Sequence, residues 1–260
     1  MQLNVVSRSP AHVTGPAPIV FVHGAWHGAW CWDEHFLPYF ADHGWDVHAV
    51  DLRAHGESPG RDRLRRTSIT DYVADVGSVV DSMDRPPVLV GHSMGGLIVQ
   101  RYLEEHVLPA GVLMASVPPR GAWRATFRTA THHPLAFAKA NLTLNLGPIV
   151  GTRTLASDLL FSPATAPDVI DKHHVRLQDE SYAAYVGMLL RWPRPDRVVT
   201  PILVLGGGDD QVFHPSEVAA TAAAYRTSAD IFQAMGHDMM LEPEWERVAD
   251  RIETWLRETL

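Results

Sequence analysis

The most constraining feature of the sequence is a serine placed between glycines, directly after a short apolar run. Residues 87–90, Pro-Val-Leu-Val, read as a buried strand, and Gly-His-Ser-Met-Gly-Gly follows at residues 91–96. Residues 97–103 then continue in a helical pattern. So tight a turn from strand to helix strains the serine backbone and leaves no room for side chains at the flanking glycines. The spacing therefore predicts that the hydroxyl of Ser93 is presented at the end of a buried strand, as a nucleophile.

A serine hydroxyl is a weak nucleophile at neutral pH, so it needs a base, and the base needs an acid to orient it. His237 follows the last short apolar run and precedes the final helical pattern, so we predict that it is the base. The preceding strand, residues 201–205, ends in a loop with two aspartates. We predict Asp210 as the acid, because the apolar residue two positions later can anchor the loop under the histidine. Asp209 is then a turn or capping residue.

Short apolar runs alternate with helical patterns along most of the chain. Strands are predicted at 19–23, 47–51, 87–92, 111–115, 201–206 and 229–234, and helices near 33–43, 70–84, 94–107, 216–226 and 244–259. Continuous apolar runs are typical of a sheet that is buried on both faces, and the alternation implies parallel strands. The pattern predicts an α/β fold with a mostly parallel, doubly wound sheet flanked by helices.

The alternation stops between about Pro118 and Pro195, a stretch far longer than an ordinary connection. We interpret residues 118–195 as a helical cap inserted in a core of residues 1–117 and 196–260, with one structural domain overall. The apolar content of the cap predicts a lipophilic pocket above the site. The side chains that we expect to contact the substrate are Trp26, Phe127, Phe137, Tyr185 and Met188.

Charge is distributed unevenly within the expected cap. No Asp or Glu occurs between Glu105 and Asp158, whereas Arg120, Arg124 and Arg128 recur at every fourth position. A helix there would carry a cationic stripe. The stripe either pairs with the acidic second half of the cap and closes it, or attracts an anionic substrate or interface. We favour the pairing, because surface charges usually have such modest roles.

The amino-acid composition limits the kinds of molecule that the protein is expected to bind. The chain has 260 residues, of which 46% are hydrophobic, enough to bury a three-layer core in a single domain. A formal charge of −8 without any basic run argues against a nucleic-acid partner. The single cysteine, Cys31, excludes an intrachain disulfide and is expected to be buried. Since neither a leader pattern nor a transmembrane-length segment is recognisable, we expect a cytoplasmic protein. The sequence does not indicate an oligomeric state.

The order Ser93, Asp210, His237, each after a buried strand, resembles the arrangement of the α/β-hydrolase superfamily. Residues 19–32, Ile-Val-Phe-Val-His-Gly-Ala-Trp-His-Gly-Ala-Trp-Cys-Trp, are similar to the first-strand signature of its esterase and hydroxynitrile lyase branch. Residues 51–58, Asp-Leu-Arg-Ala-His-Gly-Glu-Ser, look like the turn that such proteins place after the next strand. The resemblance covers nearly the whole chain and implies an α/β-hydrolase fold with a serine-esterase site.

The resemblance also implies an oxyanion hole. The loop at His23 and Gly24 would place the backbone amide of Ala25 beside that of Met94, and both would face the developing oxyanion. His23 is then structural, with its ring bridging loops, and His92 packs beside the serine turn.

These residues together predict a serine hydrolase that cleaves a carboxylic ester, or a lactone or thioester, of a small, largely apolar substrate through an acyl-enzyme. Its partners would be the small-molecule substrate and water, and it would need no metal or organic cofactor. A carbon–carbon bond hydrolase or a cofactor-free perhydrolase would keep the same triad. Similar hydroxynitrile lyases carry threonine where Gly24 stands, which argues against lyase activity. A ligand-binding or signalling protein on a hydrolase scaffold is the alternative from another class.

Overall fold

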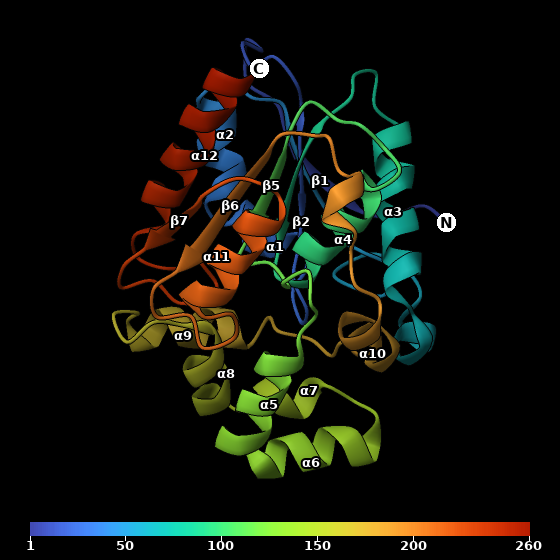
Figure 1. Cartoon of the computed structure of the whole chain (residues 1–260), viewed down its shortest axis with the longest axis vertical. Helices are drawn as coiled ribbons and strands as arrows, with labels where there is room; N and C mark the ends of the chain where they lie inside the picture. Colours follow the sequence, from blue (N-terminus) through green and yellow to red (C-terminus); the bar gives the residue numbers. More distant parts are fainter.

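The computed structural model describes all 260 residues, and its centre is a seven-stranded sheet (Figure 1). The strands are β1 (Val5–Arg8), β2 (Ile19–Val22), β3 (Val47–Val50), β4 (Val88–His92), β5 (Gly111–Met114), β6 (Ile202–Gly207) and β7 (Ala229–Phe232). Their order is β1-β3-β2-β4-β5-β6-β7, and only β1 runs antiparallel to its neighbour. The predicted fold class and all six predicted strands are confirmed. β1 was not predicted, because it is a half-exposed edge strand without a continuous apolar run.

Six helices cover the two faces of the sheet. They are α1 (Trp30–Asp33), α2 (Phe36–Asp42), α3 (Ile69–Asp81), α4 (Met94–Leu103), α11 (Pro215–Ala224) and α12 (Trp245–Thr259), and a 3-10 turn, η1 (Arg61–Arg66), precedes α3. The helices α1, α2 and α12 pack in one apolar cluster, and α3, α4 and α11 pack in the other. Neighbouring strand residues alternate between the clusters, because side chains alternate across a strand: Phe21 faces α2, and Val20 and Val22 face the other layer.

Cys31 lies in the first cluster. Burial raises the pKa of its thiol well above the ordinary value, in agreement with the predicted packing role. No helix of the protein has both the length and the apolar character needed to cross a lipid bilayer.

The chain between β5 and β6 forms helices only. These are α5 (Trp123–His132), α6 (Pro134–Thr143), α7 (Gly147–Val150), α8 (Arg153–Leu160), α9 (Pro167–His174) and α10 (Tyr182–Leu190), followed by the 3-10 turn η2 (Pro195–Arg197). In Figure 1 the helices α5 to α8 gather at the lower end of the molecule, beyond the sheet. We refer to residues 118–195 as the inserted segment. Its role as a separate cap remains a prediction.

The predicted pairing of the arginine stripe with the acidic half of the inserted segment is wrong. Arg120 lies in the turn before α5, so the stripe does not continue along one helix. Arg128 Nη2 instead bonds to Glu217 Oε2 of α11 at 2.6 Å and to the carbonyl of Val212, both in the core. Arg120 and Arg124 are exposed, and neither forms an ion pair. The sequence pattern could not show that the helix would turn Arg128 towards the sheet.

Candidate active site

Ser93 occupies a strained turn between β4 and α4. Its backbone has φ 52° and ψ −116°, a region that non-glycine residues rarely adopt and that costs about 1–3 kcal/mol. A Cβ at Gly91 would lie 2.5 Å from the carbonyl oxygen of Gly95, and a Cβ at Gly95 would lie 2.3 Å from that of Val22. The predicted need for glycine at both positions therefore has a steric basis. The Ser93 amide donates to Met114 O of β5 at 3.0 Å, which fixes the turn to the sheet.

His237 and Asp210 are joined by a hydrogen bond in the loops that follow β7 and β6. His237 Nδ1 donates to Asp210 Oδ2 at 2.9 Å, and both side chains are buried. The other carboxylate oxygen, Oδ1, accepts from the amides of Val212 at 2.7 Å and Phe213 at 2.9 Å. These bonds fix the carboxylate and hold the proton of a neutral His237 on Nδ1, so that Nε2 is free to accept one. Asp209 lies in the same turn, where only its backbone makes hydrogen bonds.

The loop of His237 packs against the serine turn. His92 Nε2 donates to the carbonyl oxygen of His237 at 3.0 Å, and the two imidazole rings are 4.7 Å apart. Phe213 packs edge-on against His237, with ring centres 5.6 Å apart. No hydrogen bond joins the Ser93 hydroxyl to His237 in this structure. The structure thus pairs His237 with Asp210 and sets the loop of His237 beside the serine turn.

Two backbone amides near the serine turn are unpaired, one in the loop after β2 and one at the start of α4. The N–H groups of Ala25 and Met94 donate to no protein acceptor, and the latter begins α4, where the helix dipole favours negative charge. A Cβ at Gly24 would lie 3.0 Å from Ser93 Cβ and 2.8 Å from His92 Nδ1. The loop therefore approaches the serine turn so closely that a side chain at position 24 would require His92 to shift.

His23 and His92 are buried as neutral rings. His23 Nδ1 donates to Gly24 O at 2.8 Å, and its Nε2 accepts from the amide of Leu52 at 3.2 Å. Burial, helped by the charge of His55, lowers the pKa of His23 to about 3. Burial and the nearby His237 hold the pKa of His92 well below its ordinary value. His23 thus bridges the loops after β2 and β3, and His92 packs beside the serine turn, both as predicted.

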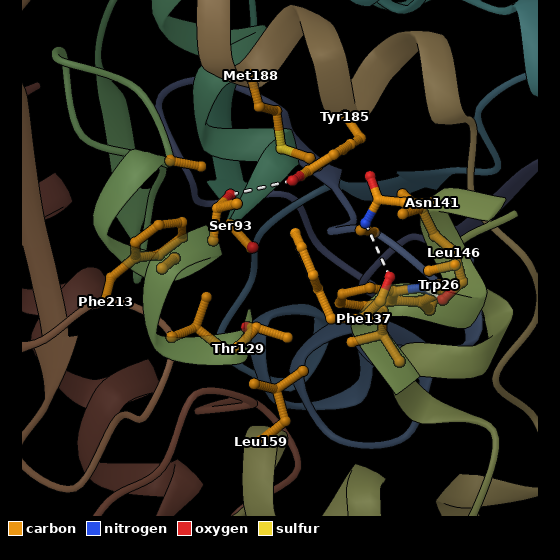
Figure 2. Close-up of a pocket in the computed structure, with 17 residues that line it drawn as sticks. Trp26, Ser93, Thr129, Phe137, Asn141, Leu146, Leu159, Tyr185, Met188 and Phe213 are labelled. Atoms are coloured by element: carbon orange, nitrogen blue, oxygen red, sulfur yellow. Dashed lines mark hydrogen bonds between the residues drawn. The ribbon is translucent and has the colours of Figure 1, made fainter. Parts of the chain in front are cut away.

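Ser93 opens into a largely apolar cavity between the core and the inserted segment (Figure 2). Of the side chains predicted to contact a substrate, Trp26, Phe137, Tyr185 and Met188 line this cavity. Phe127 does not line it and is 71% exposed. The face of α5 that meets the cavity carries small residues instead, Ala122, Ala125, Thr126 and Thr129.

Several lining residues were missed by sequence reasoning: Ile149, Leu159, Val212 and Phe213. The spacing of small residues on α5 was the available signal for its inner face, since i, i+3, i+4 and i+7 share one side of a helix. The large side chains on α5 had instead suggested that the opposite face of this helix lines the cavity. No group of three or more His, Cys, Asp or Glu side chains is arranged to hold a metal ion.

Comparison with known proteins agrees with this geometry. Residues 19–251 match the model of the alpha/beta hydrolase family. The chain belongs to the alpha/beta hydrolase family. Among proteins similar to this hydrolase is a monoacylglycerol lipase of Mycolicibacterium smegmatis, 24% identical over 239 residues that cover 86% of this chain and 82% of that protein. A non-heme chloroperoxidase of Streptomyces lividans is 28% identical over 253 residues, which cover 86% of each chain.

The solved structures similar to this hydrolase include the monoacylglycerol lipase of Paleococcus ferrophilus. It superposes with a TM-score of 0.76 at 22% identity and covers 100% of both chains. At this identity the likeness shows the fold, which agrees with the superfamily resemblance seen in the sequence.

Proposed function

We propose that this alpha/beta hydrolase cleaves carboxylic esters, with Ser93 as nucleophile, His237 as general base and Asp210 as the acid that orients it. The observation that carries the proposal is the position of Ser93. Its hydroxyl lies at a strained turn on the wall of an apolar cavity, beside a loop in which His237 is bonded to Asp210 at 2.9 Å. Strain of this kind is found where function requires it. Family membership supports a hydrolase, and the similar proteins include lipases.

The reaction follows from these positions. His237 Nε2 takes the proton of Ser93 as Oγ attacks the ester carbonyl carbon. The amides of Ala25 and Met94 donate to the oxyanion, and each such donor typically contributes a hundredfold or more to the rate. His237 then protonates the leaving alcohol and activates a water molecule, which hydrolyses the acyl-enzyme. The chemistry needs no metal or organic cofactor.

The cavity favours an apolar acyl group. Of its 17 lining residues, 13 are hydrophobic, and the polar ones other than Ser93 are Thr126, Thr129 and Asn141. Two of these are engaged within the protein: Tyr185 Oη donates to Thr126 Oγ1 at 3.3 Å, and Asn141 Nδ2 donates to Phe137 O at 2.8 Å. Few hydrogen-bonding groups are therefore left for a substrate, so binding rests on apolar contact.

Turnover of p-nitrophenyl esters of short and medium acyl chain tests this proposal. We expect steady hydrolysis by the wild type and a loss of at least about a thousandfold in Ser93→Ala, with the melting temperature unchanged. Hydrolysis that persists in the folded variant would refute the nucleophile. Release of less than one equivalent of nitrophenol, together with a large ligand-induced rise in melting temperature, would favour a ligand-binding protein instead.

A second candidate, perhydrolysis on the same residues, is favoured by the similarity to a protein named as a non-heme chloroperoxidase. In this reaction hydrogen peroxide takes the place of water in attacking the acyl-enzyme. Peroxyacid formation from an ester and hydrogen peroxide, compared with ester hydrolysis at equal protein concentration, separates the two. Carbon–carbon bond cleavage would require the same triad with a diketone substrate, and no feature of the cavity favours it.

A further inference from the structure

A buried ion pair lies next to the proposed oxyanion loop. His27 Nε2 is 3.0 Å from Asp238 Oδ2, and His27 Nδ1 is 2.7 Å from the carbonyl oxygen of Ala25. The two side chains are 1% and 0% exposed. Both ring nitrogens face acceptors, and a neutral imidazole carries only one N–H. His27 is therefore an imidazolium, and Asp238 is its carboxylate partner.

The electrostatic effects on the pKa values of His27 and Asp238 support the same charge states. Burial by itself lowers the pKa of His27, but the charge of Asp238 and the hydrogen bond to it outweigh burial and raise the pKa above its ordinary value. For Asp238, burial raises the pKa, and the charge of His27 outweighs it and lowers the pKa. The second oxygen, Asp238 Oδ1, makes no hydrogen bond and lies 3.9 Å from His92 Nε2, so His27 is the main counter-charge.

The pair joins two loops that are 211 residues apart in sequence. Asp238 directly follows His237, the proposed base. The bond from His27 to Ala25 O spans Trp26, whose backbone has the left-handed value φ 66° and whose indole lines the cavity. A tryptophan in this conformation is strained and persists only where its surroundings hold it. The imidazolium of His27 is the side chain that closes this turn.

We propose that Asp238 and His27 are positioning residues that hold the backbone of residues 25–27 so that the Ala25 amide faces the oxyanion on Ser93. This inference rests on the proposed function. The pair touches no reacting atom, and it acts by fixing a donor whose hydrogen bond strengthens as the ester carbonyl becomes an oxyanion. Loss of the pair should therefore lower kcat and leave KM nearly unchanged, because the donor matters most in the transition state.

The chain contains a matched control. His55 Nε2 lies 3.1 Å from Glu180 Oε2, and Nδ1 lies 3.1 Å from Arg53 O, so this ring is also held between a carboxylate and a carbonyl. Both side chains are fully buried. The pair ties the loop after β3 to the inserted segment and makes no hydrogen bond to residues 23–27 or to the serine turn. The His55 ring packs 4.9 Å from that of His23, but no hydrogen bond joins the pair to the oxyanion loop, so it reports the effect of removing a buried imidazolium–carboxylate pair that does not bond to this loop.

The test compares Asp238→Asn with Glu180→Gln in the full chain. For p-nitrophenyl butyrate we expect kcat to fall between about tenfold and a hundredfold in Asp238→Asn, with KM within about twofold. Affinity for an alkyl trifluoromethyl ketone, which forms a tetrahedral adduct with an active serine, should fall by a similar factor. Glu180→Gln should keep kcat within about twofold, while its melting temperature falls by as much as that of Asp238→Asn. Equal kcat in the two variants, or a rise in KM alone, would overturn the proposal.

If Asp238→Asn fails to fold, a second measurement still tests the inference. Nitrogen NMR of the wild type at pH 7 to 8 should show two histidines with both ring nitrogens protonated, His27 and His55, and one of the two should disappear in His27→Gln. A neutral His27 at pH 7 would refute the ion pair. Failure of the proposed function is recognised separately, because then the wild type shows no ester turnover that depends on Ser93.

Discussion

At the scale of single residues, the chemistry of the site depends on which hydrogen-bonding groups are left unused. Ser93 Oγ and His237 Nε2 make no bond within the protein, whereas both carboxylate oxygens of Asp210 are occupied. The proposed orienting acid is thus fixed before a substrate arrives, and the two groups that would exchange a proton in the proposed reaction stay available. Such preorganisation avoids reorganising the site during the reaction.

Asp210→Asn should lower kcat by about a thousandfold to ten-thousandfold. The amide would donate to His237 Nδ1 and so move the imidazole proton to Nε2, where it blocks the transfer from Ser93. Asp209→Asn is the control, since the carboxylate at position 209 makes no hydrogen bond, and its kcat should stay within about twofold. Steady-state kinetics with one p-nitrophenyl ester compares the two variants. A larger loss in Asp209→Asn would reverse the assignment of the acid.

At the scale of elements, the parallel strands bring the functional loops to one edge of the sheet. Ser93 follows β4, Asp210 follows β6, His237 follows β7, and the loop of His23 follows β2. Carboxyl ends of parallel strands meet at one edge, which is where such folds bind ligands. His23 ties the loop after β2 to the loop after β3 through the amide of Leu52, and it can do so only as a neutral ring that accepts from that amide.

Because His23 is neutral in the folded protein, we predict that the free energy of unfolding decreases at acidic pH. Its pKa of about 3 lies below the ordinary 6.5, so between these values the unfolded chain binds an extra proton. The contribution of His23 to the free energy of unfolding is therefore fully present above pH 6.5. It is lost as pH falls, by about 1.4 kcal/mol for each pH unit. Between pH 7 and 5, His23→Gln should lose about 2 kcal/mol less than the wild type in urea unfolding. Parallel losses in the two proteins would show that His23 does not carry this effect.

At the scale of the whole molecule, charged contacts tie the inserted segment to the core at three places; at one of them, Lys172 and Arg176 pair with Glu34. Arg128 of α5 reaches Glu217 of α11 at 2.6 Å, with side chains 17% and 6% exposed. His55 and Glu180 form a second, fully buried tie. The cavity lies between these two parts of the chain, so its shape depends on how the inserted segment is held.

Arg128→Gln should destabilise the protein by about 2 kcal/mol, because Glu217 is left nearly buried without its cation. Arg124→Gln on the same helix is the matched control: Arg124 is exposed and unpaired, so its effect should stay within about 0.5 kcal/mol. Urea unfolding measures both free energies. If the two variants are equally stable, the bond to Glu217 does not hold the inserted segment.

Local patterns account for what could be predicted. The six predicted strands and the serine turn could be recognised because each depends on residues within a few positions of one another, such as Gly91 and Gly95 around Ser93. The edge strand β1 was missed because half of its surface is exposed and no apolar run marks it. The roles of Ser93, His237 and Asp210 in catalysis remain predictions that the proposed experiments test.

The sequence by itself determined the fold class, the strained serine turn and the loops that hold the proposed base and acid, because these follow from short-range periodicity and glycine sterics. Only the tertiary structure decided which face of α5 lines the cavity, that Arg128 turns to the core, and that Asp238 pairs with His27 across 211 residues. Which side of a helix is buried, and which distant charge a group meets, depend on packing between elements. A linear pattern of residue types does not contain that information.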